Sequence, residues 1–275
     1  MLRSPPLRAD SHPALNPGVA RREVFGWAMY DFANSGYTTV VLTAVFNAYF
    51  VATIAGNAPW ATFAWTVALG ISYAIVMVAG PIVGAWADAH AAKKRALAAT
   101  TVACVAGTAL LAGAGPGDIA WAVAFIVVSN VAYSLGENIT AAFLPEIARP
   151  SSVGKVSGWG WSLGYFGGLL SLGLCLAWVM SAPGRGETTV QSVPGAMLIT
   201  AAVFAFASLP TFLLLRERAV PVPPASDSRT PLPALRVPPG KPPPTATSLP
   251  SSPAARFIRR AWPPSLPSPR STPSR

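Results

Sequence analysis

The stretch WAMYDFANSGYTTVVLTAVFNAYF, residues 27–50, places an acid and an amide at the head of a long apolar run. An ionisable side chain inside a bilayer costs roughly 2.5–3.5 kcal/mol or more, so such a residue usually has a role or a polar partner. At the angular spacing of an α-helix, four polar residues fall within one arc of roughly 100°: Asp31, Asn34, Ser35 and Thr38. The stretch therefore predicts a membrane-spanning helix that carries a polar stripe near one end.

The composition of the whole chain also indicates a membrane protein. Of its 275 residues, 52% are apolar and only 11% are charged, whereas a soluble domain carries about 25% charged residues. The net charge of +10 does not indicate a nucleic-acid partner, because the basic residues lie at segment edges and near the C-terminus rather than on one face. Cys104 and Cys175 each lie within an apolar run and are interpreted as packing residues.

Six apolar segments are long enough to cross a hydrocarbon core of about 30 Å at about 1.5 Å per residue. They cover residues 27–51, 60–87, 96–114, 118–143, 158–180 and 195–215. The expected fold class is an all-α integral membrane protein with six transmembrane helices, in a domain of residues 23–218.

The Lys and Arg residues that flank these segments lie on one side of the membrane, apart from Arg185. Cytoplasmic loops carry the excess of basic residues in membrane proteins. The pattern therefore predicts an even number of spans and two cytoplasmic termini, in a bacterial inner or plasma membrane. The basic residues concerned are Arg3, Arg8, Arg21, Arg22, Lys93, Lys94, Arg95, Arg149, Lys155, Arg216 and Arg218.

The two ends of the chain differ in composition from the apolar domain. Residues 1–22 contain four prolines and no continuous apolar core, which indicates a short disordered cytoplasmic arm rather than a signal peptide. Residues 219–275 are rich in Pro, Ser and Arg and cannot bury enough apolar surface to fold. Two interpretations of this C-terminal segment stay open: a native disordered basic tail, or sequence that results from a frameshift in a GC-rich gene.

A second polar stripe lies in the segment 118–143. Four residues recur at i, i+4, i+7 and i+8, close to the spacing of one helical face: Asn130, Ser134, Glu137 and Asn138. Glu137 and Asp31 are expected at similar depths from the cytoplasmic surface, so their two helices can line one water-filled cavity. The alternative is that these polar groups hydrogen-bond neighbouring helices or reach the interface. The candidate residues for binding substrate or a proton are Asp31, Asn34, Asn130, Glu137 and Asn138.

A face of small residues begins the segment 158–180. Gly160, Gly164 and Gly168 recur every four residues, and glycines at this spacing let two helix backbones approach closely. Fixed packing is the simpler interpretation. The alternative is a smooth face that slides during a transport cycle.

The loop GAWADAHAAKKR joins the second and third segments. Its acid is expected to face the positive N-terminal end of a nearby helix, and its cations suit anionic lipid headgroups. A positive-inside loop alone would explain the cations but not the G-x-x-x-D spacing. Its residues are Gly84, Asp88, Lys93, Lys94 and Arg95.

This loop resembles the signature loop of the major facilitator superfamily, and the resemblance implies that it is a gating loop. Ala89, Ala91 and Ala92 stand where that pattern prefers Arg, Gly and Arg. Four longer stretches are more specific: WAMYDFANSGY, AAFLPEIA, VSGWGWSLGYFGG and FASLPTFLLLRE. Together, over residues 22–218, they resemble the vacuole-effluxer-like family, whose fungal members are autophagy-related amino-acid exporters. The resemblance implies twelve helices in two six-helix halves, with helices 1 and 4 lining a central cavity. It assigns to that cavity Asp31, Asn34, Glu137 and Asn138.

These observations predict the N-terminal six-helix half of a secondary transporter for small solutes, with amino-acid efflux implied by the resemblance. No cofactor or metal is expected, and the expected partners are a small-molecule substrate or a proton and membrane lipids. A homodimer that replaces the second half, an inactive fragment, and a membrane scaffold whose basic tail binds anionic lipid stay open as alternatives. A six-helix intramembrane enzyme is disfavoured, because no Ser/His pair or metal-ligand cluster lies within a span.

Overall fold

The computed structural model describes residues 12–188 and 190–218. Within these ranges the chain is helical apart from turns, loops and one isolated bridge between Leu15 and Ala148. Six helices there are long and apolar enough to cross a membrane, which confirms the six predicted spans of an all-α integral membrane protein. The elements after the first span are α3 Ala61–Ala89, α4 Lys93–Leu111, α5 Ile119–Ala142, α6 Leu144–Ile147, α7 Val153–Met180 and α8 Val193–Leu214, with 3-10 turns at Pro150–Ser152 and Pro183–Arg185.

The first span, Arg21–Ile54, is not the single α-helix that the sequence predicts. It consists of α1 (Arg21–Tyr37), a π-helical segment (Thr38–Ala44), α2 (Phe46–Tyr49) and a second π-helical segment (Phe50–Ile54). The Val45 N–H donates to the Val40 carbonyl oxygen at 2.9 Å, five residues back, which is the bonding pattern of a π-helix. Such segments are frequent at functional sites, and the first one begins at Thr38, the last residue of the predicted polar stripe.

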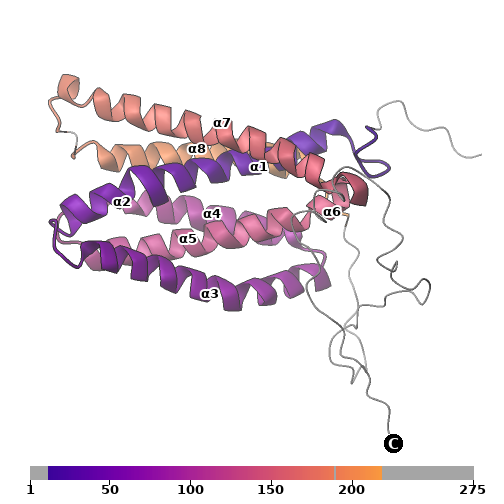
Figure 1. Ribbon diagram of the computed structural model, residues 1–275, viewed down its shortest axis with the longest axis horizontal. Helices are drawn as coiled ribbons and strands as arrows, with labels where there is room; N and C mark the ends of the chain where they lie inside the picture. The colour runs from indigo at the N-terminus through magenta and orange to yellow at the C-terminus, as the bar shows by residue number, and fades with distance from the viewer. Residues whose placement is uncertain (1–11, 189, 219–275) are drawn as a thin grey trace, which may run out of the picture. The chain divides into compact units, whose positions relative to one another are not determined.

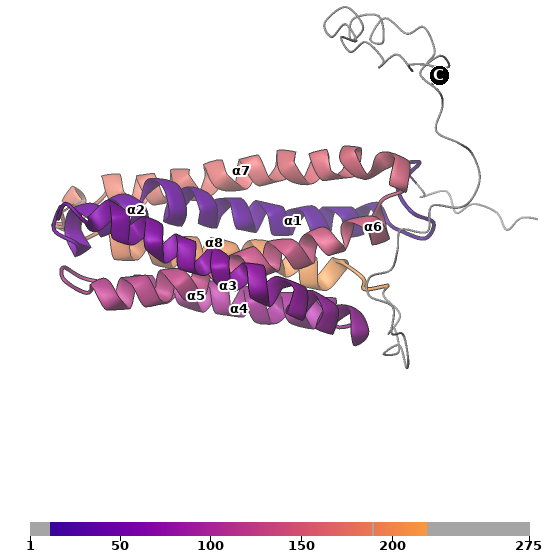
Figure 2. The same cartoon turned by 60° about the horizontal axis from the view of Figure 1, so that its bottom comes forward.

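Two groups of helices make up the bundle (Figures 1 and 2). α1 packs against α7 and α8, α5 packs against α3 and α4, and α4 also contacts α8. The α3–α4 and α5–α7 connections lie at the end of the bundle where α1 begins and α8 ends, and the other connections lie at the opposite end (Figure 1). α3 lies at an edge and exposes apolar side chains such as Met77 and Ile82. That surface suits contact with lipid or with another helix.

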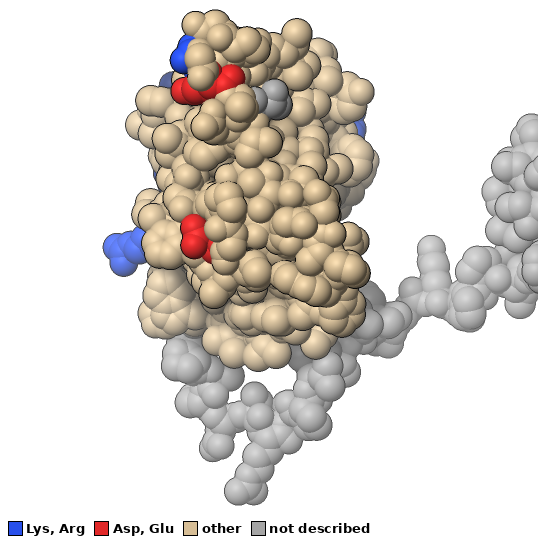
Figure 3. Space-filling model, turned by 90° about the vertical axis from the view of Figure 1, so that its left-hand side faces the viewer, with Lys and Arg blue, Asp and Glu red and all other residues tan. Residues whose placement is uncertain are grey.

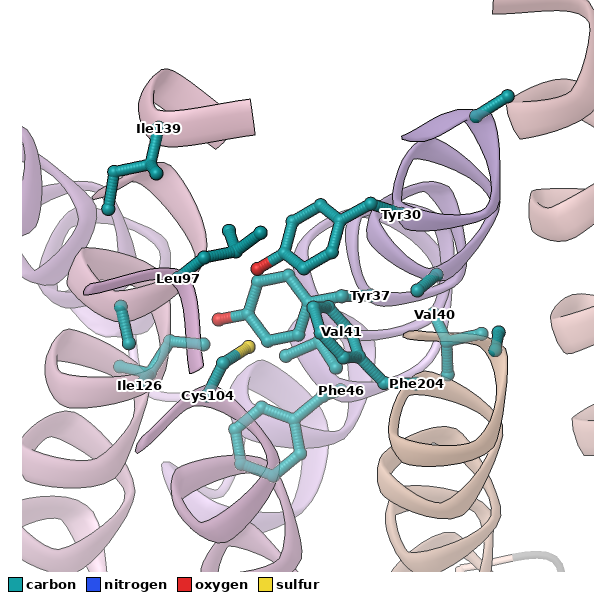
Figure 4. Packing of buried hydrophobic residues seen from close by; sticks show 14 of the residues in the cluster. Tyr30, Tyr37, Val40, Val41, Phe46, Leu97, Cys104, Ile126, Ile139 and Phe204 are labelled. Carbon is teal, nitrogen blue, oxygen red and sulfur yellow. The ribbon is translucent and has the colours of Figure 1, made fainter. Parts of the chain in front are cut away.

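Aromatic side chains of α1 fill the interior between the two groups (Figure 4). Tyr30 and Tyr37 point toward α4 and α5, and both are fully buried. The Tyr30 hydroxyl lies 3.0 Å from Thr101 Oγ1, and the Tyr37 hydroxyl lies 2.8 Å from Ser129 Oγ. The large rings therefore occupy the core while their polar tips are hydrogen-bonded. Cys104 lies in the same cluster, and both cysteines of the chain are buried and unbridged, as expected for packing residues.

The glycines of α7 lie against the first span. A Cβ atom on Gly160, Gly164 or Gly168 would lie less than 3.0 Å from side-chain atoms of that span. Gly167, which the four-residue spacing does not single out, lies closest of these glycines. Its Cβ would lie 2.7 Å from the carbonyl carbon of Phe32. Larger residues at these positions would force the two helices apart.

The segment before α1 has defined contacts at residues 12–20, which corrects the prediction of disorder for this part of the arm. Leu15 is buried, and its carbonyl oxygen accepts a hydrogen bond from Arg149 Nε at 2.8 Å. The Asn16 N–H donates to the Ile147 carbonyl oxygen at 3.0 Å. These contacts tie the segment to the connection between α5 and α7. Arg21 and Arg22 of the predicted arm begin α1. Residues 1–11 of the arm and the predicted C-terminal tail lie outside the described residues.

Candidate functional site

A pocket of about 370 Å³ opens between the first span, α5 and α7. Its wall combines two carboxyl groups, an amide, several hydroxyls and two exposed aromatic rings, and the described residues that line it include no Lys or Arg. The pocket is therefore anionic, although it lies within membrane-spanning helices. Its polar and aromatic lining consists of Asp31, Asn34, Ser35, Thr38, Thr39, Tyr133, Glu137, Trp161 and Tyr165.

α1 supplies the first acid and the amide through its helical spacing. Asp31, Asn34 and Ser35 are separated by three and four positions and so share one face. The carboxylate of Asp31 lies beside Gly164 of α7, where no side chain competes for the space. Asn34 is only 4% exposed, and its Oδ1 has no hydrogen-bond partner among the described residues. Buried amide oxygens normally have a partner, so this oxygen is available to a ligand.

α5 supplies the second acid, Glu137, which is exposed in the pocket. One turn earlier, the Tyr133 ring stacks on Tyr37 with ring centroids 5.0 Å apart and planes inclined by 25°. The Tyr133 hydroxyl accepts a hydrogen bond from Thr38 Oγ1 at 3.0 Å. These contacts join α5 to the start of the π-helical segment, and they hold the helix that carries Glu137 beside the helix that carries Asp31.

The other two amides of the predicted α5 stripe lie outside this pocket. Asn130 is fully buried, and neither polar atom of its side chain has a partner among the described residues. Asn138 lines a separate pocket of about 460 Å³ between α3 and α5. Adjacent residues of a helix point about 100° apart, so Asn138 and Glu137 face different neighbours. Of the five candidate residues, the structure thus brings together Asp31, Asn34 and Glu137.

Trp161 and Tyr165 are candidate site residues that the sequence analysis did not single out. Their side chains are 79% and 71% exposed, and they lie one turn apart on the pocket side of α7. Aromatic faces beside carboxylates are suited to binding cationic groups. The available signal was their i, i+4 spacing, which interleaves with Gly164 and Gly168 on the same helix.

Comparison with known proteins identifies the family. The family model described as "Vacuole effluxer Atg22 like" matches residues 51–234, more than half of the chain. The chain belongs to the vacuole effluxer Atg22-like family. The motifs of the spans indicate this family, and the match confirms it. The matched residues contain Glu137 and the predicted gating loop but begin after Asp31 and Asn34.

One relative of this Atg22-like chain is the "Uncharacterized MFS-type transporter YxiO" of Bacillus subtilis (strain 168). The two sequences are 31% identical over 199 residues, which is 70% of this chain and 46% of that protein. The chain therefore spans about half the length of the curated relative it matches. No solved structure matches the chain.

The residues of the predicted gating loop lie at the end of α3 and at the start of α4 in this Atg22-like chain. Lys93 Nζ lies 3.1 Å from Asp88 Oδ1 and 2.8 Å from Glu146 Oε1. Lys94 Nζ donates to two carbonyl oxygens at the end of α8. These two lysines are thus engaged within the bundle, which corrects their interpretation as headgroup anchors, whereas Arg95 is exposed. The loop residues that line the pocket between α3 and α5 are Gly84, Asp88 and Lys93.

The carboxylate that caps the N-terminus of α4 belongs to Glu217, not to Asp88. Glu217 follows α8, and its side chain accepts hydrogen bonds from the backbone N–H groups of Lys93 at 2.6 Å and Lys94 at 3.2 Å. An acid at this position satisfies free N–H groups and meets the positive end of the helix dipole. Asp88 pairs with Lys93 instead.

Arg218 extends these contacts to α1 in the Atg22-like bundle. Its guanidinium Nη2 lies 2.8 Å from an oxygen of Glu23, whose side chain is only 3% exposed. Its backbone N–H donates to Glu146 Oε2 at 3.1 Å. We call the whole set the terminal charge network. Its members are Glu23, Asp88, Lys93, Lys94, Glu146, Glu217 and Arg218.

Proposed function

We propose that this chain supplies one six-helix unit of a secondary transporter for small solutes, with the pocket between the first span, α5 and α7 as one wall of the substrate path. The observation that carries the proposal is that Asp31 and Glu137 line one open pocket within membrane-spanning helices. Acids inside a membrane are costly and mark substrate or ion pathways. Membership of the family, and the naming of the relative as an MFS-type transporter, support the same function.

The chemistry of the pocket favours a substrate with a cationic group. Asp31 and Glu137 attract positive charge, and the exposed faces of Trp161 and Tyr165 add a surface suited to an ammonium group. An amino acid has such a group, and amino acids are the substrate class we propose for efflux. A proton carried by the same two acids is the alternative cargo.

We assign the end of the bundle that carries the terminal charge network to the cytoplasm. Basic residues are concentrated there, whereas the opposite end, which faces the viewer in Figure 3, is mostly uncharged. At this side, Glu217 after α8 accepts hydrogen bonds from the first backbone N–H groups of α4, directly after the α3–α4 loop. This contact between the loop region and α8 supports a gating role for the loop. The proposed location is a bacterial cytoplasmic membrane, and the relative from Bacillus subtilis supports it.

A polar pocket cannot face hydrocarbon, so a transporter of this kind needs a second unit to cover it. Further residues of a longer protein are one source, and a second copy of this chain in a homodimer is the other. The exposed apolar surface of α3, beside the pocket that contains Asn138, offers additional area for such a contact.

Flux into proteoliposomes tests the proposal. The chain and a tandem fusion of two copies are reconstituted separately and assayed with a mixture of radiolabelled amino acids. Asp31→Asn and Glu137→Gln keep the shape of each side chain and remove its charge, so each is expected to lower flux at least tenfold while inserting normally. Asp118→Asn, which changes an acid in the α4–α5 loop outside the pocket, is the control.

Normal flux in both pocket variants would contradict the assignment of these acids to the substrate path. Lack of flux in the single chain together with flux in the tandem fusion would identify a second copy as the covering unit. Lack of flux in both forms would favour an inactive fragment or a membrane scaffold over a transporter.

A further inference from the structure

The pocket holds two separate sets of polar groups. One set, which we call the α1 oxygen cluster, consists of Asp31, Asn34 and Ser35. The other set combines Glu137 of α5 with the aromatic rings of α7. We propose that the α1 oxygen cluster binds an alkali-metal cation, with Na⁺ as the biological ion. This proposal rests on the proposed transport function for its purpose, because the bound ion would be the coupling ion that accompanies the substrate.

Oxygen atoms of the cluster converge beside Gly164. The position that a Cβ atom on Gly164 would take lies 2.9 Å from Asp31 Oδ2 and 2.8 Å from Ser35 Oγ. The equivalent position on Gly168, one turn along α7, lies 2.9 Å from Thr39 Oγ1 and 3.5 Å from the Ser35 carbonyl oxygen. The first span thus presents a row of oxygen atoms to a helix face without side chains.

Asn34 provides an independent indication of a ligand. Its side chain lines the same pocket, is only 4% exposed, and has an Oδ1 atom without a partner among the described residues. A buried acceptor without a donor is rare in folded proteins, and a bound ion is one accepted explanation. A metal cation requires acceptor atoms only, and each side chain of the α1 oxygen cluster offers an acceptor oxygen.

The ligand set favours a monovalent cation over a divalent or soft metal. Carboxylate, amide and hydroxyl oxygens suit hard cations, whereas soft metals prefer sulfur and nitrogen ligands. The cluster has one carboxylate, which balances a single positive charge. Among the described residues, moreover, no group of three or more His, Cys, Asp or Glu side chains could hold a metal ion. π-helical segments are frequent at functional sites, and one begins here at Thr38.

Cation binding can be measured on the purified chain in detergent, without transport. Thermal unfolding is followed at matched ionic strength in chlorides of Na⁺, Li⁺, K⁺ and N-methylglucamine. A ligand that binds only the folded state raises the melting temperature. For a dissociation constant of about 10 mM, about 100 mM Na⁺ is expected to raise it by roughly 3–6 °C relative to N-methylglucamine.

Three variants locate the site. Asp31→Asn, Asn34→Leu and Ser35→Ala are each expected to remove the Na⁺-dependent rise. Asp118→Asn is the matched control and is expected to keep it. Ser35→Ala deletes a single hydroxyl group, so it keeps the test decisive even if Asp31→Asn or Asn34→Leu does not fold.

Three results would overturn the proposal. The first is equal melting temperatures in Na⁺ and N-methylglucamine, and the second is an equal rise in the Na⁺, Li⁺ and K⁺ chlorides. The third is a Na⁺-dependent rise that persists in Ser35→Ala and in the folded variants of the other two residues. The flux assay is read separately. A Na⁺-dependent rise without solute flux would sustain the ion site and reject the transport function. Solute flux without a Na⁺-dependent rise in melting temperature would sustain the transport function and reject the ion site.

Discussion

Replacing Gly167 by alanine should separate α7 from α1, because the obstacle to the new side chain is backbone. A Cβ atom on Gly167 would lie 2.7 Å from the carbonyl carbon and 2.8 Å from the Cα atom of Phe32, and closer still to its carbonyl oxygen. Carbon atoms in favourable contact are about 3.5–4.0 Å apart, so the helices must shift by about 1 Å. Overpacking of this kind typically costs about 1–3 kcal/mol, and a backbone obstacle places the cost at the upper end.

The matched control is Gly173→Ala, because a Cβ atom on Gly173 would have no neighbour within 4 Å. Both variants gain the same helix propensity, up to about 1 kcal/mol, so the difference between them isolates the α1–α7 contact. A difference of about 3 kcal/mol should lower the melting temperature of Gly167→Ala by roughly 6–12 °C relative to the control. Size-exclusion chromatography of heated detergent samples measures this difference. Melting temperatures within about 2 °C of each other would refute the close contact.

Two further predictions concern the ends of the bundle. Glu217→Ala should destabilise the protein by about 1–2 kcal/mol through loss of the α4 cap, whereas Glu187→Ala, at the opposite end, should change stability little; equal melting temperatures would argue against the cap. Single cysteines that replace exposed Pro116 and Gln191 should react with a membrane-impermeant maleimide in intact cells, and one at Ser151 should react only after permeabilisation, while both native cysteines are buried. Reaction of the Ser151 variant in intact cells would reverse the proposed orientation.

The six spans could be predicted because the length and the apolar composition of a segment are enough to indicate a membrane-spanning helix. The segment predicted at 195–215, for example, is α8, Val193–Leu214. The π-helical turns of the first span could not be predicted in the same way. Their bonding pattern is not set by local propensity, and the residues around them, such as Tyr37 and Phe46, pack against other helices.

The candidate site was predictable only where the relative positions of its residues depend on the geometry of a single helix. The shared face of Asp31 and Asn34 follows from their spacing, and the structure places both in one pocket. The position of Asn138 depends on which side of α5 meets α3, and sequence spacing contains no such information. The cap on α4 joins Lys93 to Glu217, which are 124 residues apart. No rule of local spacing connects residues at that separation.

Ribosomes synthesise Glu217 and Arg218 last among the described residues, after all six spans. Glu23 precedes Arg218 by 195 residues. At a synthesis rate of about 5–20 residues per second, Arg218 is therefore made roughly 10–40 s after Glu23. Until Glu217 and Arg218 are made, α4 lacks the Glu217 cap, and Glu146 lacks the backbone bond from Arg218. The end of the bundle that carries the terminal charge network can therefore complete its contacts only once the sixth span has left the ribosome. Until then, the Glu23 side chain, which is only 3% exposed in the folded chain, lacks its ion pair with Arg218.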